Sequence, residues 1–168
     1  MRWGVSGAPV PSFVPFAAEI TAACAAYPGG FPPCFLAAIK LNETEWSTDP
    51  AQLQDGANPT TLCLPDGSAA GVGPFQLTAS YPANWRDPQA SADYALRCFL
   101  APAVQFFLDR VPGIGGVALV KCAAAAYNAG EGGAWTGYEE GNVDLLDTNG
   151  YGARAVLNFE TLVAGRRP

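Results

Sequence analysis

The sequence predicts a mainly α protein that forms a single domain with long loops and at most a short β-hairpin. Three observations lead to this prediction. Apolar residues recur at helical spacing in several segments, strand-like alternation is poor, and 19 Gly and 15 Pro residues separate the helical segments. With 168 residues, of which 49% are hydrophobic, the chain is long enough to bury one sizeable core.

Two helices are predicted near the start of the chain. The first covers residues 12–27, with Ser12 as its N-cap and the turn sequence Tyr27-Pro28-Gly29-Gly30 as its stop. The second covers residues 34–46 and follows two prolines. Residues 47–70 lack periodicity and are rich in Pro and Gly, which predicts a long loop of the kind that is usually functional or mobile.

The second half of the chain is predicted to be helical with one further loop. A short hairpin around residues 62–78 is the only strand structure that the pattern allows. In the next helix, Ser91 is the expected N-cap and Pro102 a kink or break. That helix covers residues 89–110, and a further helix is predicted over residues 114–128. An aromatic-containing loop over residues 131–147 and a terminal helix over residues 150–164 follow.

The chain contains no histidine. This excludes Ser-His-Asp and Cys-His nucleophile pairs, zinc sites with His ligands and His general bases. Catalysis would therefore depend on carboxyl groups, assisted by Tyr, Asn and Gln. Glycoside cleavage is the large class of reactions that proceeds on carboxyl groups alone. The composition implies no cofactor and no metal ion.

The formal net charge of −6 argues against a nucleic-acid partner, which would require a basic surface. No apolar run approaches the roughly 20 residues that span a bilayer, so no membrane span is expected. The start of the chain has one basic residue, and Pro9, Pro11 and Pro15 interrupt any apolar region of a signal peptide. Action outside a cytoplasm would depend on delivery, for example by a phage particle or a lysis system.

Five cysteines without a CxxC pair argue against a zinc ribbon or a thioredoxin-like motif. Most of them are expected to be buried, reduced thiols, and Cys98 and Cys122 fit this best because they lie in apolar helical runs. Cys24 and Cys34 flank a Pro/Gly turn, so the alternative for these two is a disulfide bond between them in an oxidising compartment.

Glu43 is the candidate general acid. At about 100° per residue, it shares one face of its predicted helix with Phe35 and Ile39, whereas Glu45 lies on the polar side. A carboxyl group on an apolar face resists ionisation, which lets it hold a proton near neutral pH. The alternative is a partly exposed Glu without a catalytic role.

Three further segments carry candidate binding residues. In Gly71-Val72-Gly73-Pro74-Phe75-Gln76 the glycines permit close approach to a ligand, and Gln76 offers a donor and an acceptor for sugar hydroxyl and acetamido groups. In Ala126-Tyr127-Asn128-Ala129-Gly130 a glycine closes the helix, and Asn128 is a ligand group or a cap. In Thr148-Asn149-Gly150-Tyr151 the tyrosine is a site residue or a core residue.

In this order and at these spacings, the four segments resemble the soluble lytic transglycosylase and goose-type lysozyme family, which cleaves the glycan strands of bacterial peptidoglycan. The resemblance extends from about Phe35 to Val163. It implies that residues 31–168 form a lysozyme-like transglycosylase domain and that residues 1–30 are an N-terminal helical segment packed on it.

The resemblance also implies roles for individual residues. Glu43-Thr44 stands where the family has its catalytic Glu-Ser pair, and Gln76 keeps the place of the Gln in Gly-x-Gly-Leu-Met-Gln, although Pro74-Phe75 replaces Leu-Met. Thr44, Gln76, Tyr127 and Asn128 are thus expected to bind substrate. Tyr151 is expected to hydrogen-bond and orient Glu43; the following Gly152 departs from the family's Val.

Asp66 is a candidate second carboxylate, because goose-type lysozymes have an Asp in that neighbourhood that helps to activate water. A solvated turn residue in Pro65-Asp66-Gly67 is the alternative. Tyr81, Trp135 and Tyr138 are expected either to stack on sugar rings or to pack against the protein.

The expected function is that of a lytic transglycosylase, which cuts the β-1,4 bond between N-acetylmuramic acid and N-acetylglucosamine and forms 1,6-anhydro ends. Two alternatives stay open: a goose-type lysozyme that hydrolyses the same bond, and a non-catalytic structural or wall-binding virion protein of the same fold. The expected partners are peptidoglycan glycan strands and other virion proteins. The expected place of action is the virion or the bacterial periplasm and cell wall.

Overall fold

The computed structural model describes residues 3–78, 80–145 and 149–167, and it confirms the mainly α class. In these ranges strand pairing is limited to isolated bridges, so the short hairpin that the sequence allowed around residues 62–78 is not formed as a regular strand pair. Two bridges, Cys63–Ala69 and Val72–Leu77, occur in that segment. None of the helices in the described ranges is both long and apolar enough to cross a lipid bilayer.

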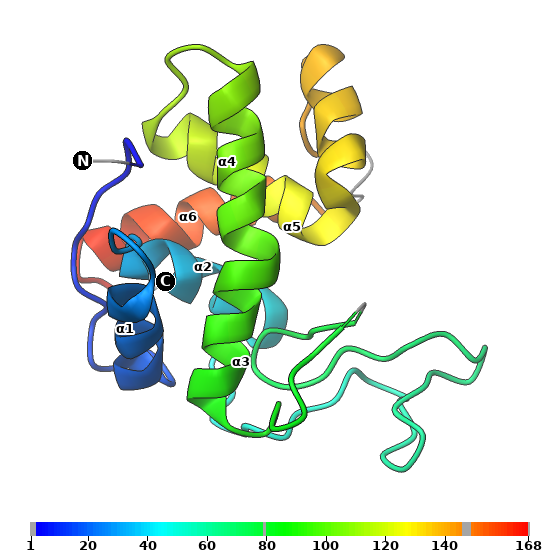
Figure 1. Cartoon of the computed structure of the whole chain (residues 1–168). Coiled ribbons are helices and arrows are strands. Elements are labelled where there is room, and N and C mark those ends of the chain that lie inside the picture. The colour runs from blue at the N-terminus through cyan, green and yellow to red at the C-terminus, as the bar shows by residue number, and fades with distance from the viewer. Residues whose placement is uncertain (1–2, 79, 146–148, 168) are drawn as a thin grey trace.

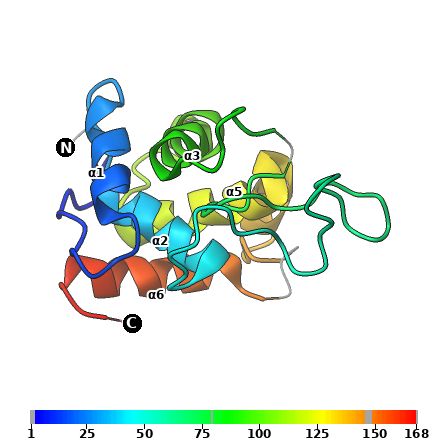
Figure 2. The same ribbon diagram turned by 90° about the horizontal axis from the view of Figure 1, so that it is seen from below.

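The helices form three layers (Figure 2). Helices α2 (Pro33–Thr44) and α5 (Gly116–Glu139) lie between α6 (Tyr151–Val163) and a rod that begins with α3 (Pro88–Ala95). The first helix, α1 (Ala17–Ala26), packs against α2 and α3.

Helix α2 is the centre of the core. All side chains from Cys34 to Leu41 are buried, as expected of a helix that is apolar on nearly every side. The helix ends at Glu45, whose φ of 47° lies in the left-handed region. Lys40 is buried too, and its ammonium group donates to the carbonyls of Glu45 (2.7 Å) and Ser47 (2.8 Å). These bonds fix the turn that follows Glu43.

Helix α1 is shorter than predicted. It begins at Ala17 rather than at residue 12, so Ser12 is not its N-cap. The residue before the helix, Phe16, adopts a left-handed conformation (φ 61°), and a backbone bond from Val14 N to Pro11 O closes a turn before it. The prolines in this stretch hold the chain in turns instead of a helical first turn.

The rod in front of the molecule in Figure 1 comprises α3, the π-helical turn η1 (Leu96–Leu100) and α4 (Ala101–Arg110). The predicted range is confirmed, but the N-cap is Asp87 rather than Ser91: the Asp87 carboxylate accepts bonds from the two backbone amides of Gln89 and Ala90. Pro102 does not break the rod. The chain widens into the π turn just before it, where Ala101 N bonds to Leu96 O.

Cys98 lies on the outward face of η1 and is exposed, because Leu96 and Leu100 occupy the buried face of the same turn. The expectation that Cys98 is buried is therefore wrong. All five cysteines are free thiols, and Cys24, Cys34 and Cys122 are buried as expected.

Helix α5 continues beyond its predicted end. It bends at Gly130 (φ 76°, ψ 160°) and then runs on to Glu139, where the sequence predicted a loop. Trp135 and Tyr138 stack on each other with ring centroids 5.4 Å apart, and both pack against Phe107 of α4. This packing explains why a glycine-rich segment becomes helical, and it shows that these two aromatic rings pack against the protein.

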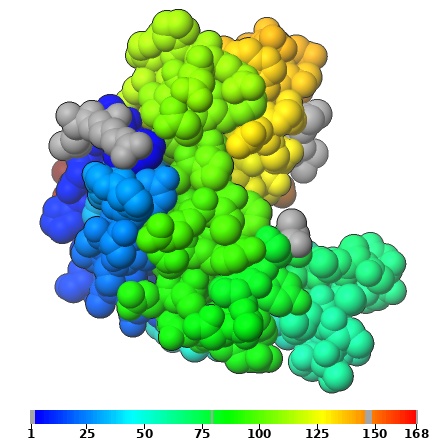
Figure 3. All heavy atoms as spheres, in the orientation of Figure 1, coloured from blue at the N-terminus to red at the C-terminus, as the bar shows by residue number. Residues whose placement is uncertain are grey.

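The loop predicted for residues 47–70 is present and extends to residue 78. Residues 47–78 project from the helical body as a lobe (Figures 1 and 3). Figure 3 shows a recess between this lobe and α5. The C-terminal end of α2 leads into the lobe, which brings Glu43 to the boundary between the two parts.

Candidate active site

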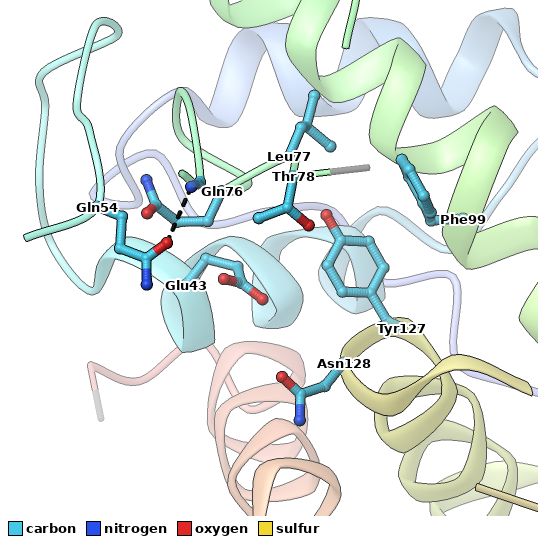
Figure 4. A pocket seen from close by; sticks show the side chains of 9 residues that line it. Glu43, Gln54, Gln76, Leu77, Thr78, Phe99, Tyr127 and Asn128 are labelled. Atoms are coloured by element: carbon cyan, nitrogen blue, oxygen red, sulfur yellow. Dashed lines mark hydrogen bonds between the residues drawn. The ribbon is translucent and has the colours of Figure 1, made fainter. Parts of the chain in front are cut away.

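A cavity of about 360 Å³ lies where the end of α2, the lobe, η1 and α5 meet (Figure 4). It brings together residues of three of the four predicted segments, which are far apart in the chain. Its lining residues are Glu43, Gln54, Gly71, Gln76, Leu77, Thr78, Phe99, Tyr127 and Asn128. Glu43, Gln76, Tyr127 and Asn128 were predicted from the sequence, and the structure places all four in one cavity.

Glu43 lies in the last turn of α2 and is half-buried. The hydroxyl group of the buried Tyr151 donates a hydrogen bond to Glu43 Oε1 at 2.5 Å. Burial raises the pKa of Glu43 to about 7, while the Tyr151 hydrogen bond and the positive charge of Arg154 act in the opposite direction. Near neutral pH a large fraction of the Glu43 carboxyl groups therefore carries a proton that can be donated.

Tyr151 remains a hydrogen-bond donor over the same pH range. Burial is the main reason that the pKa of the Tyr151 phenol lies well above its usual value, and the negative charge of Glu43 is the second. The phenol therefore keeps its proton, and Glu43 accepts from it.

The start of α6 is held in place by Asp144. The Asp144 carboxylate accepts hydrogen bonds from Gly152 N (2.7 Å) and Ala153 N (3.2 Å) and lies 3.6 Å from Lys121 Nζ of α5. A Cβ atom on Gly152 would lie 2.6 Å from Asp144 Oδ1 and 2.7 Å from Lys121 O. The close approach of α6 to α5 therefore explains why Gly stands at this position, and it fixes the neighbouring Tyr151.

Asn42 connects α2 to α6 beside the candidate acid. Its Nδ2 donates to Tyr151 O, and its Oδ1 accepts from Asn158 Nδ2, both at 2.8 Å. Asn42, the residue before Glu43, thus holds the backbone of Tyr151, and the hydroxyl group of Tyr151 in turn holds Glu43.

Thr44 does not line the cavity. It is buried, and its Oγ1 donates to Pro74 O at 2.9 Å and to Lys40 O at 3.3 Å. The expectation that Thr44 contacts substrate is not met, because its hydroxyl group points to the lobe's backbone. Tyr127 makes a matching bond from α5, from its Oη to Phe75 O at 2.9 Å, so α2 and α5 both anchor this loop.

The glycine-rich segment is shaped by its own contacts. Gln76 has a left-handed backbone (φ 45°), and its Nε2 donates to Gly73 O at 2.9 Å. A Cβ atom on Gly71 would lie 2.7 Å from Gln76 Oε1, and Gly73 has a φ of 70°. Both glycines are therefore required for Gln76 to lie in the cavity wall.

Gln54 and Phe99 also line the cavity, and the sequence did not single them out. Gln54 exchanges two bonds with Gly71: its Oε1 accepts from Gly71 N (3.0 Å), and its backbone N donates to Gly71 O (2.9 Å). Phe99 packs edge-on against Tyr127 with centroids 5.9 Å apart. Neither belongs to a motif, since Gln54 lies in an aperiodic loop and Phe99 in an apolar helical run.

Asp66 lies outside the cavity in an exposed turn of the lobe. Ser68 donates to Asp66 Oδ1 from its hydroxyl group (2.6 Å) and its backbone N (2.9 Å), and these bonds lower the pKa of Asp66. Of the two readings, the solvated turn residue is the one that this environment matches. Tyr81 is exposed and likewise does not line the cavity.

Among the described residues that line the cavity, Glu43 is the only one with a carboxyl group. Over residues 3–78, 80–145 and 149–167, no three Cys, Asp or Glu side chains are grouped so that they could hold a metal ion. The arrangement offers one proton donor, several amide groups and an aromatic wall.

Comparison with protein-family models and with curated proteins found no match for the chain.

Proposed function

We propose that the protein is a peptidoglycan lytic transglycosylase that uses Glu43 as its single acid and base. The observation that carries this proposal is the state of Glu43. It is the only carboxyl group among the described lining residues, burial raises its pKa to about 7, and Tyr151 orients it.

The reaction needs one carboxyl group in two roles. Protonated Glu43 donates its proton to the glycosidic oxygen between N-acetylmuramic acid and N-acetylglucosamine, and the bond from the anomeric carbon to that oxygen breaks. The Glu43 carboxylate then takes the proton of the muramic acid C6 hydroxyl group, whose oxygen attacks the anomeric carbon. The products are a free 4-hydroxyl group and a 1,6-anhydro ring, and Glu43 is protonated again.

The other lining residues suit an amide-bearing sugar. Asn128 is exposed in the cavity wall, and the half-buried Gln76 offers its Oε1 as an acceptor. Phe99 and Tyr127 form the apolar side of the cavity, against which the CH face of a sugar ring can pack.

Mass spectrometry of digested peptidoglycan tests this proposal. A transglycosylase releases anhydro products that are lighter by one water than the products of a lysozyme. We expect anhydro products from the wild-type protein and none from Glu43→Gln. Reducing ends would identify a hydrolase instead, activity retained in Glu43→Gln would overturn the assignment of the acid, and an inactive wild-type protein would favour a structural role.

A further inference from the structure

A second groove, of about 230 Å³, lies between the end of α2 and α6. Its apolar residues include Trp46, which is half-buried, and Leu157, which is 63% exposed. The groove is therefore an open, partly apolar surface next to the helix that carries Glu43.

Two opposite charges line this groove without neutralising each other. Glu45 and Arg154 are both exposed lining residues, and among the described residues neither forms an ion pair within 4.0 Å. A second cation is close by, since the Arg167 guanidinium lies 4.8 Å from the centroid of the Trp46 ring. The two charges are complementary in sign to a ligand that carries both a carboxylate and an ammonium group.

The groove adjoins the candidate active site. Glu43 lines the cavity and Glu45 lines the groove, so the last turn of α2 separates the two. Arg154 is near enough to Glu43 for its charge to act on that carboxyl group. The two lie on different sides of the end of α2, so a ligand attached to the sugar at Glu43 reaches the groove by passing around a helix about 10 Å across with its side chains.

We propose that this groove binds the stem peptide of peptidoglycan, with a peptide carboxylate on Arg154 and the free ammonium group of the peptide's diamino residue on Glu45. This inference rests on the proposed function, because stem peptides are attached to the N-acetylmuramic acid whose bond is cut. Trp46 and Leu157 cover the aliphatic part of the peptide. Because cross-linking converts the ammonium group into an amide, the groove selects stems that are not cross-linked through it.

Binding of a free peptide to the whole protein tests the inference without any cleavage. The probe is N-acetyl-L-Ala-γ-D-Glu-L-Lys-D-Ala, and binding is measured by isothermal titration calorimetry. We expect Arg154→Gln and Glu45→Gln each to weaken binding about fivefold, as for one exposed ion pair. Arg110→Gln is the matched control, because Arg110 is an exposed arginine that stacks on Phe106 away from the groove.

Two modified peptides assign the charges to their partners. Amidation of the carboxylates is expected to remove the effect of Arg154→Gln, and acetylation of the lysine amine is expected to remove the effect of Glu45→Gln. An unchanged melting temperature shows that the variants are folded. No binding of the peptide at millimolar concentration, or equal binding by all variants, would overturn the inference.

The outcome is separable from that of the proposed function. Peptide binding by a wild-type protein that cleaves no glycan would contradict the transglycosylase and leave the groove assignment in place. Cleavage of glycan by a protein that does not bind the peptide would contradict only the groove assignment.

Discussion

At the scale of single residues, the environment of Glu43 sets the pH dependence. The proposed reaction requires protonated Glu43, whose pKa is raised to about 7 by burial. We expect kcat/KM to fall about tenfold per pH unit above that value.

Tyr151→Phe removes a hydrogen bond that lowers the pKa of Glu43. The fall in activity is therefore expected to move to higher pH, while the maximal rate drops roughly 10- to 100-fold.

Tyr138→Phe is the matched control for this change. It removes a phenol hydroxyl group from an exposed tyrosine that packs on α4 outside the cavity. Its pH profile should match that of the wild-type protein. An unshifted profile in Tyr151→Phe would show that Tyr151 does not act on the proton of Glu43.

The same residue makes stability depend on pH. The pKa of Glu43 is about 7 in the folded protein and 4.5 in its ordinary state, so the folded protein binds the proton more tightly. The free energy of unfolding therefore decreases as pH rises from about 4.5 to about 7, by at most about 3 kcal/mol. Glu43→Gln cannot ionise, so its stability relative to the wild-type protein should increase over this interval in urea unfolding experiments.

Glu45→Gln serves as the control, because it removes an exposed carboxyl group two residues away. A stability difference between Glu43→Gln and the wild-type protein that is the same at low and high pH would contradict the raised pKa.

Much of the site was predictable because its residues belong to segments that resemble a family pattern. The pattern led to Glu43 and Tyr151, whose contact joins positions 108 residues apart. It did not lead to Gln54, which is tied to Gly71 through a loop with no regular pattern. It placed Thr44 in the wrong role, because a sequence does not reveal which way a hydroxyl group at a helix end points.

At the scale of elements, the positions of most helices followed from periodicity and their limits did not. The cap of α3 moved to Asp87, because a carboxylate there can accept from two backbone amides. The second half of α5 was missed, since glycines such as Gly130 and Gly132 are typical of loops. The packing of Trp135 against Phe107 of α4 makes that half helical, and local sequence does not encode this contact.

The contact between α6 and α5 leads to a prediction about glycine. In Gly152→Ala the new methyl group would collide with Lys121 O, a backbone atom that cannot move aside easily. We expect α6 to shift, Tyr151 to leave Glu43, and the protein to lose about 1–3 kcal/mol of stability together with most of its activity. Thermal unfolding and a cleavage assay measure the two effects.

Gly132→Ala provides the contrast, since a Cβ atom there meets nothing within 4 Å. This substitution in the second half of α5 is expected to be neutral or stabilising by about 0.5–1 kcal/mol. Equal behaviour of the two variants would show that the tight contact at Gly152 does not matter for the site.

At the scale of the whole molecule, the cavity exists because a lobe is fastened to a helical body. The body supplies Glu43 and Tyr127, and the lobe supplies Gln54 and Gln76. The bonds from Thr44 Oγ1 to Pro74 O and from Tyr127 Oη to Phe75 O join the two parts. Neither part alone forms the cavity, so the site depends on contacts between distant segments.

The net charge of the molecule determines how it meets its proposed substrate. A charge of −6 opposes approach to a wall whose stem peptides carry carboxylates. Raising the salt concentration from about 0.01 M to about 0.1 M shortens the screening length from about 30 Å to about 10 Å. We therefore expect the initial rate of wall cleavage to rise severalfold over this range.

A wall whose carboxylates have been amidated should show no such rise, because such a wall does not repel the negatively charged protein at any salt concentration. A rate that falls with salt on the native wall would mean that local attraction, for which Arg154 and Arg167 are the nearest candidates, outweighs the net charge.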